Sequence, residues 1–273
     1  MAVDLIALLG PIERLPIWED RVLKSIRPTK LILASNINAI TPDINVCIYI
    51  TSKYESATDT IAALIKKGIH TLVITPSMLS ILDVSKLMLL NDESRVKVWF
   101  SLWGLFQPGL STIYDRLSEV EYINTIKKVE TKSDIAEFKY RAMFYDECLL
   151  AAKWLKSPIK EVQSAGNDES KFALMRAQNG KMATFRVTYE NGISETSRYM
   201  SGLMDASFES NKHGNNATFL TNGQKIPIQL ISDKTAADVL LDNFFRDVRG
   251  LPVKPSFTLD DLNRYGVTQK ALI

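Results

Sequence analysis

The sequence has no excess of charge of either sign. Lys and Arg number 33 and Asp and Glu number 31, so the formal net charge of the 273 residues is +2. A protein that holds a nucleic-acid backbone in a long groove usually needs a basic excess. We therefore expect no nucleic acid among the partners of this chain.

Long apolar runs are also missing. No stretch approaches the roughly 18 uninterrupted apolar residues of a membrane-spanning helix. The first four residues, Met1 to Asp4, lead into an apolar segment without a basic leader. The sequence predicts a cytoplasmic protein that does not bind membranes.

Cysteine and histidine are scarce. Cys47 and Cys148 are the two cysteines, one in a predicted strand and one in a predicted helix, and they are typical of small buried apolar groups. His70 and His213 are far apart in the sequence. No group of His, Cys and Asp has the spacing of metal ligands, so we expect no metal site.

The first third of the chain alternates between apolar strands and helices. Predicted strands end at Gly10 and Ser35, and residues 45–78 read as strand, helix and strand. Such a βαβ unit has a right-handed crossover, which brings the carboxyl ends of its strands to one edge of a parallel sheet. Ligands of open α/β sheets bind at that edge. The pattern predicts a Rossmann-like α/β domain over residues 1–94.

The alternation of strands and helices ends after about Asp92. A long helix is predicted over residues 138–156, and turn signals such as Asn179-Gly180 and Asn191-Gly192 then separate strand-like segments. Asn-Gly favours tight hairpins because their central residues need positive φ. We expect an α+β domain with an open, mainly antiparallel sheet over residues 95–273. Its last helix could pack back on the first domain.

Three segments resemble one known family. Residues 63–76 read A-L-I-K-K-G-I-H-T-L-V-I-T-P, which is similar to the pattern A-L-x-x-G-x-H-V-L-x-E-K-P of the Gfo/Idh/MocA oxidoreductases. Residues 138–156 resemble its helix D-x-G-x-H-x-x-D-x-x-x-W-L, and residues 242–253 resemble F-x-x-A-I-x-x-G-x-x-P. The resemblance implies NAD or NADP as cofactor and a sugar-like or carbonyl small molecule as substrate.

The cofactor positions that the resemblance implies are altered. The G-x-G-x-x-G fingerprint is reduced to Gly10, because Ile12 replaces the second glycine and Glu13 adds a negative charge. Ile12 should fill the space of a pyrophosphate, and Glu13 should repel it. Gly10 itself can either keep its cofactor role or only end a strand. Ser35 stands where an acidic residue would accept the ribose hydroxyls, and it can bind a ribose or cap a turn.

Two further segments lie where the family binds the nicotinamide. Thr51, Ser52 and Tyr54 follow the third strand, where hydroxyl groups suit a phosphate or a sugar but also suit ordinary helix capping. Thr75 and Pro76 end the E-K-P segment, so Thr75 replaces the lysine that assists hydride transfer. Thr75 cannot donate a proton as an ammonium group does.

Glu147 is the candidate acid of the long helix. It interrupts an apolar face, and alignment through Trp154 puts it at the family's catalytic histidine. If the alignment is anchored on Asp146, that place falls on Leu150 and no acid remains. A carboxylate on a packing face is either a catalytic group or one partner of a structural ion pair.

The sequence therefore supports several roles. The first is a divergent NAD(P)-dependent oxidoreductase with weakened or lost catalysis. The alternative is a non-catalytic small-molecule-binding or regulatory protein that keeps the fold. We also expect a homo-oligomer of at least two copies, formed through the uncovered face of the second sheet. That face should include some of five residues: Phe172, Leu174, Met182, Phe185 and Val187.

Overall fold

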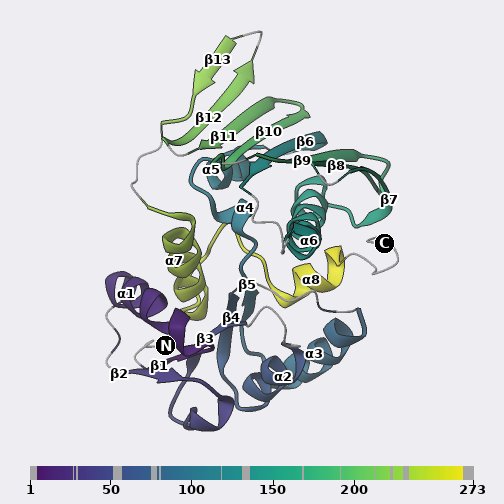
Figure 1. Cartoon of the computed structure of the whole chain (residues 1–273). Helices are drawn as coiled ribbons and strands as arrows, with labels where there is room; N and C mark the ends of the chain where they lie inside the picture. The colour runs from purple at the N-terminus through teal and green to yellow at the C-terminus, as the bar shows by residue number, and fades with distance from the viewer. Residues whose placement is uncertain are drawn as a thin grey trace. The chain divides into compact units, whose positions relative to one another are not determined.

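The chain divides into two compact units in the computed structural model (Figure 1). The first unit comprises residues 1–103 and 234–263, and the second comprises residues 104–233 and 264–273. The division between 94 and 95 expected from the sequence differs from these bounds, since residues 95–103 and 234–263 associate with the first unit. The structure describes residues 5–26, 28, 30–51, 57–74, 79, 81–117, 119–130, 136–167, 169–190, 192–211, 213–221, 224–229 and 234–266.

A five-stranded parallel sheet forms the first unit, with the order β2-β1-β3-β4-β5. Its strands are β1 (Leu5–Leu9), β2 (Lys30–Ala34), β3 (Val46–Ile50), β4 (His70–Ile74) and β5 (Val98–Phe100). Its helices are η1 (Ile12–Arg14), α1 (Leu15–Ile26), η2 (Ile37–Ala39), α2 (Thr58–Lys66), α3 (Ile81–Ser94) and α7 (Ala236–Val248), and α8 (Leu259–Tyr265) begins in it. Every residue of β3 is buried, because helices cover both faces of a parallel sheet.

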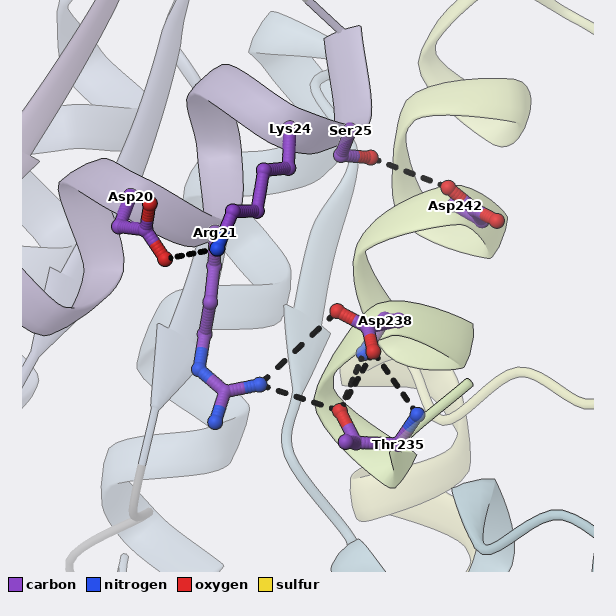
Figure 2. A network of polar contacts seen from close by, with 7 residues as sticks. All are labelled: Asp20, Arg21, Lys24, Ser25, Thr235, Asp238 and Asp242. Atoms are coloured by element: carbon purple, nitrogen blue, oxygen red, sulfur yellow. Dashed lines mark hydrogen bonds and ion pairs between the residues drawn. The ribbon is translucent and has the colours of Figure 1, made fainter. Parts of the chain in front are cut away.

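Helix α7 belongs to the first unit because it packs beside α1. Figure 2 shows the polar contacts between the two helices: Arg21 Nη1 donates to Thr235 Oγ1 at 3.1 Å, and Ser25 Oγ donates to Asp242 Oδ1 at 3.0 Å. Thr235 and Asp238 form a capping box, which satisfies backbone N–H groups of the first turn of α7. These contacts hold α7, near the end of the chain, against α1, near its beginning.

An eight-stranded sheet forms the core of the second unit, with the order β13-β12-β11-β10-β6-β9-β8-β7. The strands are β6 (Val120–Val129), β7 (Ile159–Gly166), β8 (Ser170–Ala177), β9 (Met182–Tyr189), β10 (Glu195–Gly202), β11 (Asp205–Asn211), β12 (Gly214–Thr221) and β13 (Gln224–Pro227). The helices are α4 (Trp103–Phe106), α5 (Leu110–Arg116) and α6 (Ala136–Leu155). Strands β6 and β9 are parallel, and the other neighbours are antiparallel.

One predicted hairpin is confirmed and another is wrong. β8 and β9 are antiparallel neighbours joined through Gly180, whose φ is +86°. The turn at Gly192 does not close a hairpin, because β6 lies between β9 and β10. The long strand β6 was not expected from the sequence, and its insertion separates the two strands that the turn connects.

The two faces of the eight-stranded sheet differ. Helices α5 and α6 lie on one face (Figure 1), and among the described residues the other face carries only exposed or half-buried side chains. We call it the open face. Phe172, Leu174 and Met182 lie on it, whereas Phe185 and Val187 are fully buried on the helix-covered face. Successive side chains of a strand point to opposite faces of the sheet, so Met182 lies on the open face while Phe185 and Val187, an odd number of residues further along β9, lie on the covered face.

No helix in the described part of the chain is both long enough and apolar enough to cross a membrane.

Candidate functional site

The carboxyl edge of the parallel sheet begins at Gly10, directly after β1. Gly10 has a φ of +154°, and its N–H donates to Ala34 O at 3.0 Å. A Cβ atom at Gly10 would lie 2.5 Å from Ile50 O and 2.9 Å from Ile50 Cβ. The glycine is therefore required by the close approach of β1 and β3. It does not by itself indicate a phosphate site.

The turn after Gly10 exposes the two residues that depart from the fingerprint. Ile12 is 70% exposed, and Glu13 is also exposed at the start of η1. Arg14 Nη1 donates to Thr51 O at 3.3 Å and so links this turn to the end of β3. The sequence reasoning assigned no role to Arg14. The signal that could have indicated a role for Arg14 was its positive charge, directly after Glu13 in the predicted turn.

Thr51 is held by the neighbouring strand. It is 1% exposed, and both its N–H and its Oγ1 donate to Ile74 O, at 3.1 and 3.2 Å. This geometry favours a structural role over the cofactor-binding role. The remaining candidates of this edge, Ser52, Tyr54, Thr75 and Pro76, lie outside the described residues.

The end of β2 offers one exposed hydroxyl group. Ser35 is exposed, whereas Asn36 Oδ1 accepts a hydrogen bond from Asn38 N at 3.0 Å and caps η2. Because Gly10 N–H donates to Ala34 O, the exposed residue Ser35 follows directly after the point where β2 meets the Gly10 turn. Turn capping is the role that the structure gives to Asn36.

The described residues of this edge fit a dinucleotide poorly. Ser35 can donate to a ribose, and Arg14 supplies a positive charge. Ile12 replaces the glycine that would let a pyrophosphate approach the backbone, and Glu13 places a carboxylate at the start of the helix. The N-terminus of a helix attracts a phosphate through its partial positive charge, and the carboxylate of Glu13 opposes this attraction.

A second group of polar residues lies inside the other unit, between α6 and the sheet. Arg198 Nη2 donates to both carboxylate oxygens of Glu147, each at 2.7 Å, and Lys127 Nζ lies 2.7 Å from Glu147 Oε1. Arg198 Nε donates to Thr125 Oγ1 at 3.0 Å. Glu147 is 4% exposed and Arg198 is 3% exposed. We call Glu147, Arg198, Lys127 and Thr125 the buried ion cluster.

The cluster keeps Glu147 ionised. Burial alone would raise the pKa of Glu147, but the charges of Arg198 and Lys127 and their hydrogen bonds outweigh burial and lower the pKa to about 2. A carboxylate with such a pKa holds no proton to donate at neutral pH. Of the two alternatives left open by the sequence, the geometry favours the structural ion pair.

Asp146 differs from its neighbour. It is half-buried, and its pKa is raised from 3.8 to about 7. Burial is the main cause, the charge of Lys127 opposes the rise, and the charge of Glu147 adds to it. Of the two adjacent carboxyl groups, Asp146 is the one whose pKa is raised toward neutral pH.

One donor of the cluster has no partner among the described residues. Arg198 Nη1 is buried without a hydrogen bond, close to the backbone of Gly104. A Cβ atom at Gly104 would lie 2.6 Å from Leu150 Cδ2, so this space is already filled by packing.

The two histidines have no part in either group. His70 begins β4, at the amino edge of the parallel sheet, and its Nδ1 accepts from Lys97 N at 2.9 Å. His213 is exposed between β11 and β12. Within the described ranges, no three His, Cys, Asp or Glu residues gather in a way that could hold a metal ion.

Comparison with known proteins identifies the fold. No family model matches the sequence, and no curated protein matches it. Among solved structures, the UDP-N-acetylglucosamine 3-dehydrogenase GnnA from Acidithiobacillus ferrooxidans superposes with a TM-score of 0.81 at 11% identity, over 100% of both chains. A protein assigned as an NADPH-dependent oxidoreductase from Desulfitobacterium hafniense gives 0.78 at 12%, over 100% of this chain and 95% of that one.

A third similar structure is the dehydrogenase MviM from Clostridium difficile, with a TM-score of 0.72 at 11% identity, over 99% of this chain and 98% of that one. At these identities the likeness establishes the fold and not the activity. The predicted fold class, a Rossmann-like domain followed by an α+β domain with an open, mainly antiparallel sheet, is confirmed.

Proposed function

We propose that this chain is a divergent oxidoreductase of the Gfo/Idh/MocA type, which binds NAD or NADP weakly and has weakened or lost catalysis on a sugar-like or carbonyl compound. The observation that carries the proposal is the β1, Gly10 and η1 turn at the carboxyl edge of the parallel sheet. A dinucleotide binds at that place in doubly wound sheets. Exposed Ser35, directly after the neighbouring strand β2, supports a ribose contact.

The likeness to solved structures supports the substrate class. One of them is a dehydrogenase of UDP-N-acetylglucosamine, and another is assigned to NADPH-dependent chemistry. Both superpose over nearly their whole length, so both units of this chain have counterparts in them. A sugar-like substrate and a nicotinamide cofactor are the proposals that follow for this chain.

Weak binding and weak catalysis follow from particular residues. Ile12 and Glu13 oppose a pyrophosphate, and the low pKa of Glu147 leaves no proton at the place of the family's acid. In the sequence, Thr75 replaces the lysine of the family pattern. A non-catalytic binding or regulatory protein is the second candidate, and the ion-paired state of Glu147 favours it.

Calorimetry with NAD(H) and NADP(H) tests the binding step. We expect dissociation constants in the high micromolar range or weaker, no more than about 6 kcal/mol of binding free energy. Glu13→Gln should tighten binding several-fold, because it removes the carboxylate nearest the helix start. The control Glu19→Gln changes a charge within α1 and should leave the constant unchanged. A submicromolar constant for the unmodified protein would contradict weak binding.

A turnover assay separates the two candidates. Sugars and carbonyl compounds are offered with both cofactors to the unmodified protein, and hydride transfer is followed by nicotinamide absorbance. Measurable turnover establishes the divergent enzyme. No turnover, together with saturable binding of one of these small molecules, favours the non-catalytic candidate.

A further inference from the structure

A pocket of about 380 Å³ opens at one end of strands β6 and β9, within the second unit. Its lining residues are Glu121 and Tyr122, near the start of β6, and residues 179–182, which form the β8–β9 turn and the start of β9. We call it the strand-end pocket. Its volume is within the range of small-molecule sites, roughly 300–1,000 Å³. None of its residues belongs to the carboxyl edge of the parallel sheet or to the buried ion cluster.

The turn that forms one wall of the strand-end pocket is firmly held. Asn179 Nδ2 donates to Leu155 O at 3.0 Å and Asn179 N donates to Ser157 Oγ at 3.2 Å, so the turn is bonded to the end of α6 and the residues just after it. Asn179 Oδ1 accepts from Lys181 N at 3.2 Å. No atom lies within 4 Å of the place of a Cβ at Gly180, so the wall there is open. A wall that is already ordered loses little conformational entropy when a ligand binds.

The ion pair of the strand-end pocket has unused hydrogen-bonding atoms. Lys181 Nζ lies 3.0 Å from Glu121 Oε1, and the described residues give neither group another hydrogen bond or ion pair. An ammonium group has three donors and a carboxylate has two oxygens. Two donors of Lys181 and the second oxygen of Glu121 therefore remain for a ligand. The side chains are 22% and 58% exposed, so both charges are accessible from solvent.

The opposite side of the strand-end pocket is apolar. Thr184 Oγ1 donates its proton to Asn124 Oδ1 at 2.9 Å, so Tyr122 OH donates to Thr184 Oγ1 at 3.0 Å, and this bond fixes the ring of Tyr122. Met182 lies opposite Tyr122 in the strand register and is 38% exposed. A methionine side chain adapts its shape to an apolar ligand. The pocket thus combines one cation, one anion and an apolar surface.

We propose that the strand-end pocket binds a free α-amino acid with an apolar side chain. The ligand carboxylate accepts hydrogen bonds from Lys181, the ligand ammonium group donates to Glu121, and the ligand side chain contacts Tyr122 and Met182. The two charged groups of an α-amino acid are joined through one carbon, which keeps them roughly 3 Å apart. This spacing matches the 3.0 Å between the charges of the protein, so four charges of alternating sign can form a ring.

Charge complementarity selects this class of ligand. A molecule with a carboxylate alone satisfies Lys181 and brings a second anion beside Glu121, and a molecule with an ammonium group alone does the reverse. A neutral sugar offers no charge to either group. The proposal is therefore separate from the proposed function, whose cofactor residues are all in the first unit.

Calorimetry of the full chain with L-leucine, L-methionine and L-phenylalanine tests the proposal. We expect saturable binding of at least one of them, with a dissociation constant of about 1 mM or tighter for a ligand of this size. L-Leucinamide lacks the carboxylate and N-acetyl-L-leucine lacks the ammonium group. Each should bind at least about tenfold more weakly than L-leucine, because one protein charge then has no partner of opposite sign.

Two variants locate the binding site. Lys181→Met and Glu121→Gln each remove one charge of the pocket and should weaken amino-acid binding at least about tenfold. The matched controls are Lys128→Met and Glu190→Gln, which remove the charges of a pair 3.7 Å apart at the other end of the same two strands and should leave binding unchanged. Circular dichroism of every variant shows that the fold is kept.

Three results would overturn the proposal. The first is no saturable binding of any of the three amino acids up to roughly 10 mM, tenfold above the expected constant. The second is binding that both pocket variants leave unchanged. The third is L-leucinamide or N-acetyl-L-leucine binding as tightly as L-leucine. Binding of NAD(H) or NADP(H), or its failure, has no bearing on these results, because the strand-end pocket lies wholly in the second unit.

Discussion

The two sheets of this protein bury their polar groups differently. Among the described residues of the parallel-sheet unit, the buried polar residues are Thr51, Thr58, Thr71 and Ser101, all of them hydroxyl side chains. In the unit of the eight-stranded sheet, the described buried polar residues are the hydroxyl side chains Thr125 and Ser157 and the three charged side chains Glu147, Lys153 and Arg198. A buried hydroxyl needs one hydrogen bond, whereas a buried charge needs a partner of opposite sign.

The difference follows from how each sheet is covered. Helices cover both faces of the parallel sheet, so strands such as Val46–Ile50 are apolar throughout and pack closely. The eight-stranded sheet has one covered face, and its strands alternate in burial. We infer that the first unit is most sensitive to added volume at its edge and the second to lost charge in its core.

The largest expected effect comes from removing one charge of the buried ion cluster. Glu147→Gln leaves Arg198 and Lys127 without their carboxylate and should lower the free energy of unfolding by about 3–5 kcal/mol. Chemical denaturation measures this difference. The control Glu121→Gln removes the carboxylate of the more exposed pair with Lys181, 3.0 Å away, and should cost less than about 1 kcal/mol. Equal costs for the two variants would contradict the inferred role of charge in this core.

The corresponding change in the first unit adds volume. Gly10→Ala places a methyl group 2.5 Å from Ile50 O at a φ of +154°, and should lower the free energy of unfolding by about 2–4 kcal/mol. Gly68→Ala is the control, since φ is +72° there but nothing lies within 4 Å of the added atom. It should cost about 1–2 kcal/mol through backbone strain alone. A Gly10→Ala variant no less stable than Gly68→Ala would contradict the packing argument.

The alternation of strands and helices in the first third of the chain could be predicted from the sequence because its signals are local. Apolar strands that end at Gly10 and Ser35, and a helix that ends at Gly68, indicated the parallel sheet. The placement of α7 in this unit could not be predicted. It depends on contacts such as Arg21 with Thr235, which join residues 214 positions apart.

The second unit was predicted less completely because its key signals are not local. Strand β6 carries Thr125 and Lys127 on its covered face, so its pattern does not alternate between apolar and polar residues. Those residues are compatible with burial only because Arg198 and Glu147 meet them, and Arg198 is 73 residues from Thr125. The sequence singled out Glu147 but gave no sign of which cations would surround it.

The smallest predicted effect concerns pH and sharpens the comparison, because it again involves a carboxyl group of α6. Burial raises the pKa of Asp146 from its ordinary value of 3.8 to about 7, so the folded protein binds a proton that the unfolded chain has already released above about pH 4. The stability that Asp146 contributes is therefore complete below about pH 4 and is lost as the pH rises to about 7.

Asp146→Asn removes this dependence and should raise the free energy of unfolding at pH 8 by about 1–3 kcal/mol relative to the unmodified protein, with little change at pH 4. Denaturation at pH 4, 6 and 8 measures the effect, with the exposed Asp92→Asn on α3 as a control that should follow the unmodified protein. Parallel pH profiles for Asp146→Asn and the unmodified protein would show that this carboxyl group does not titrate near neutral pH, and the charge sensitivity of the second unit would then rest on the buried ion cluster alone.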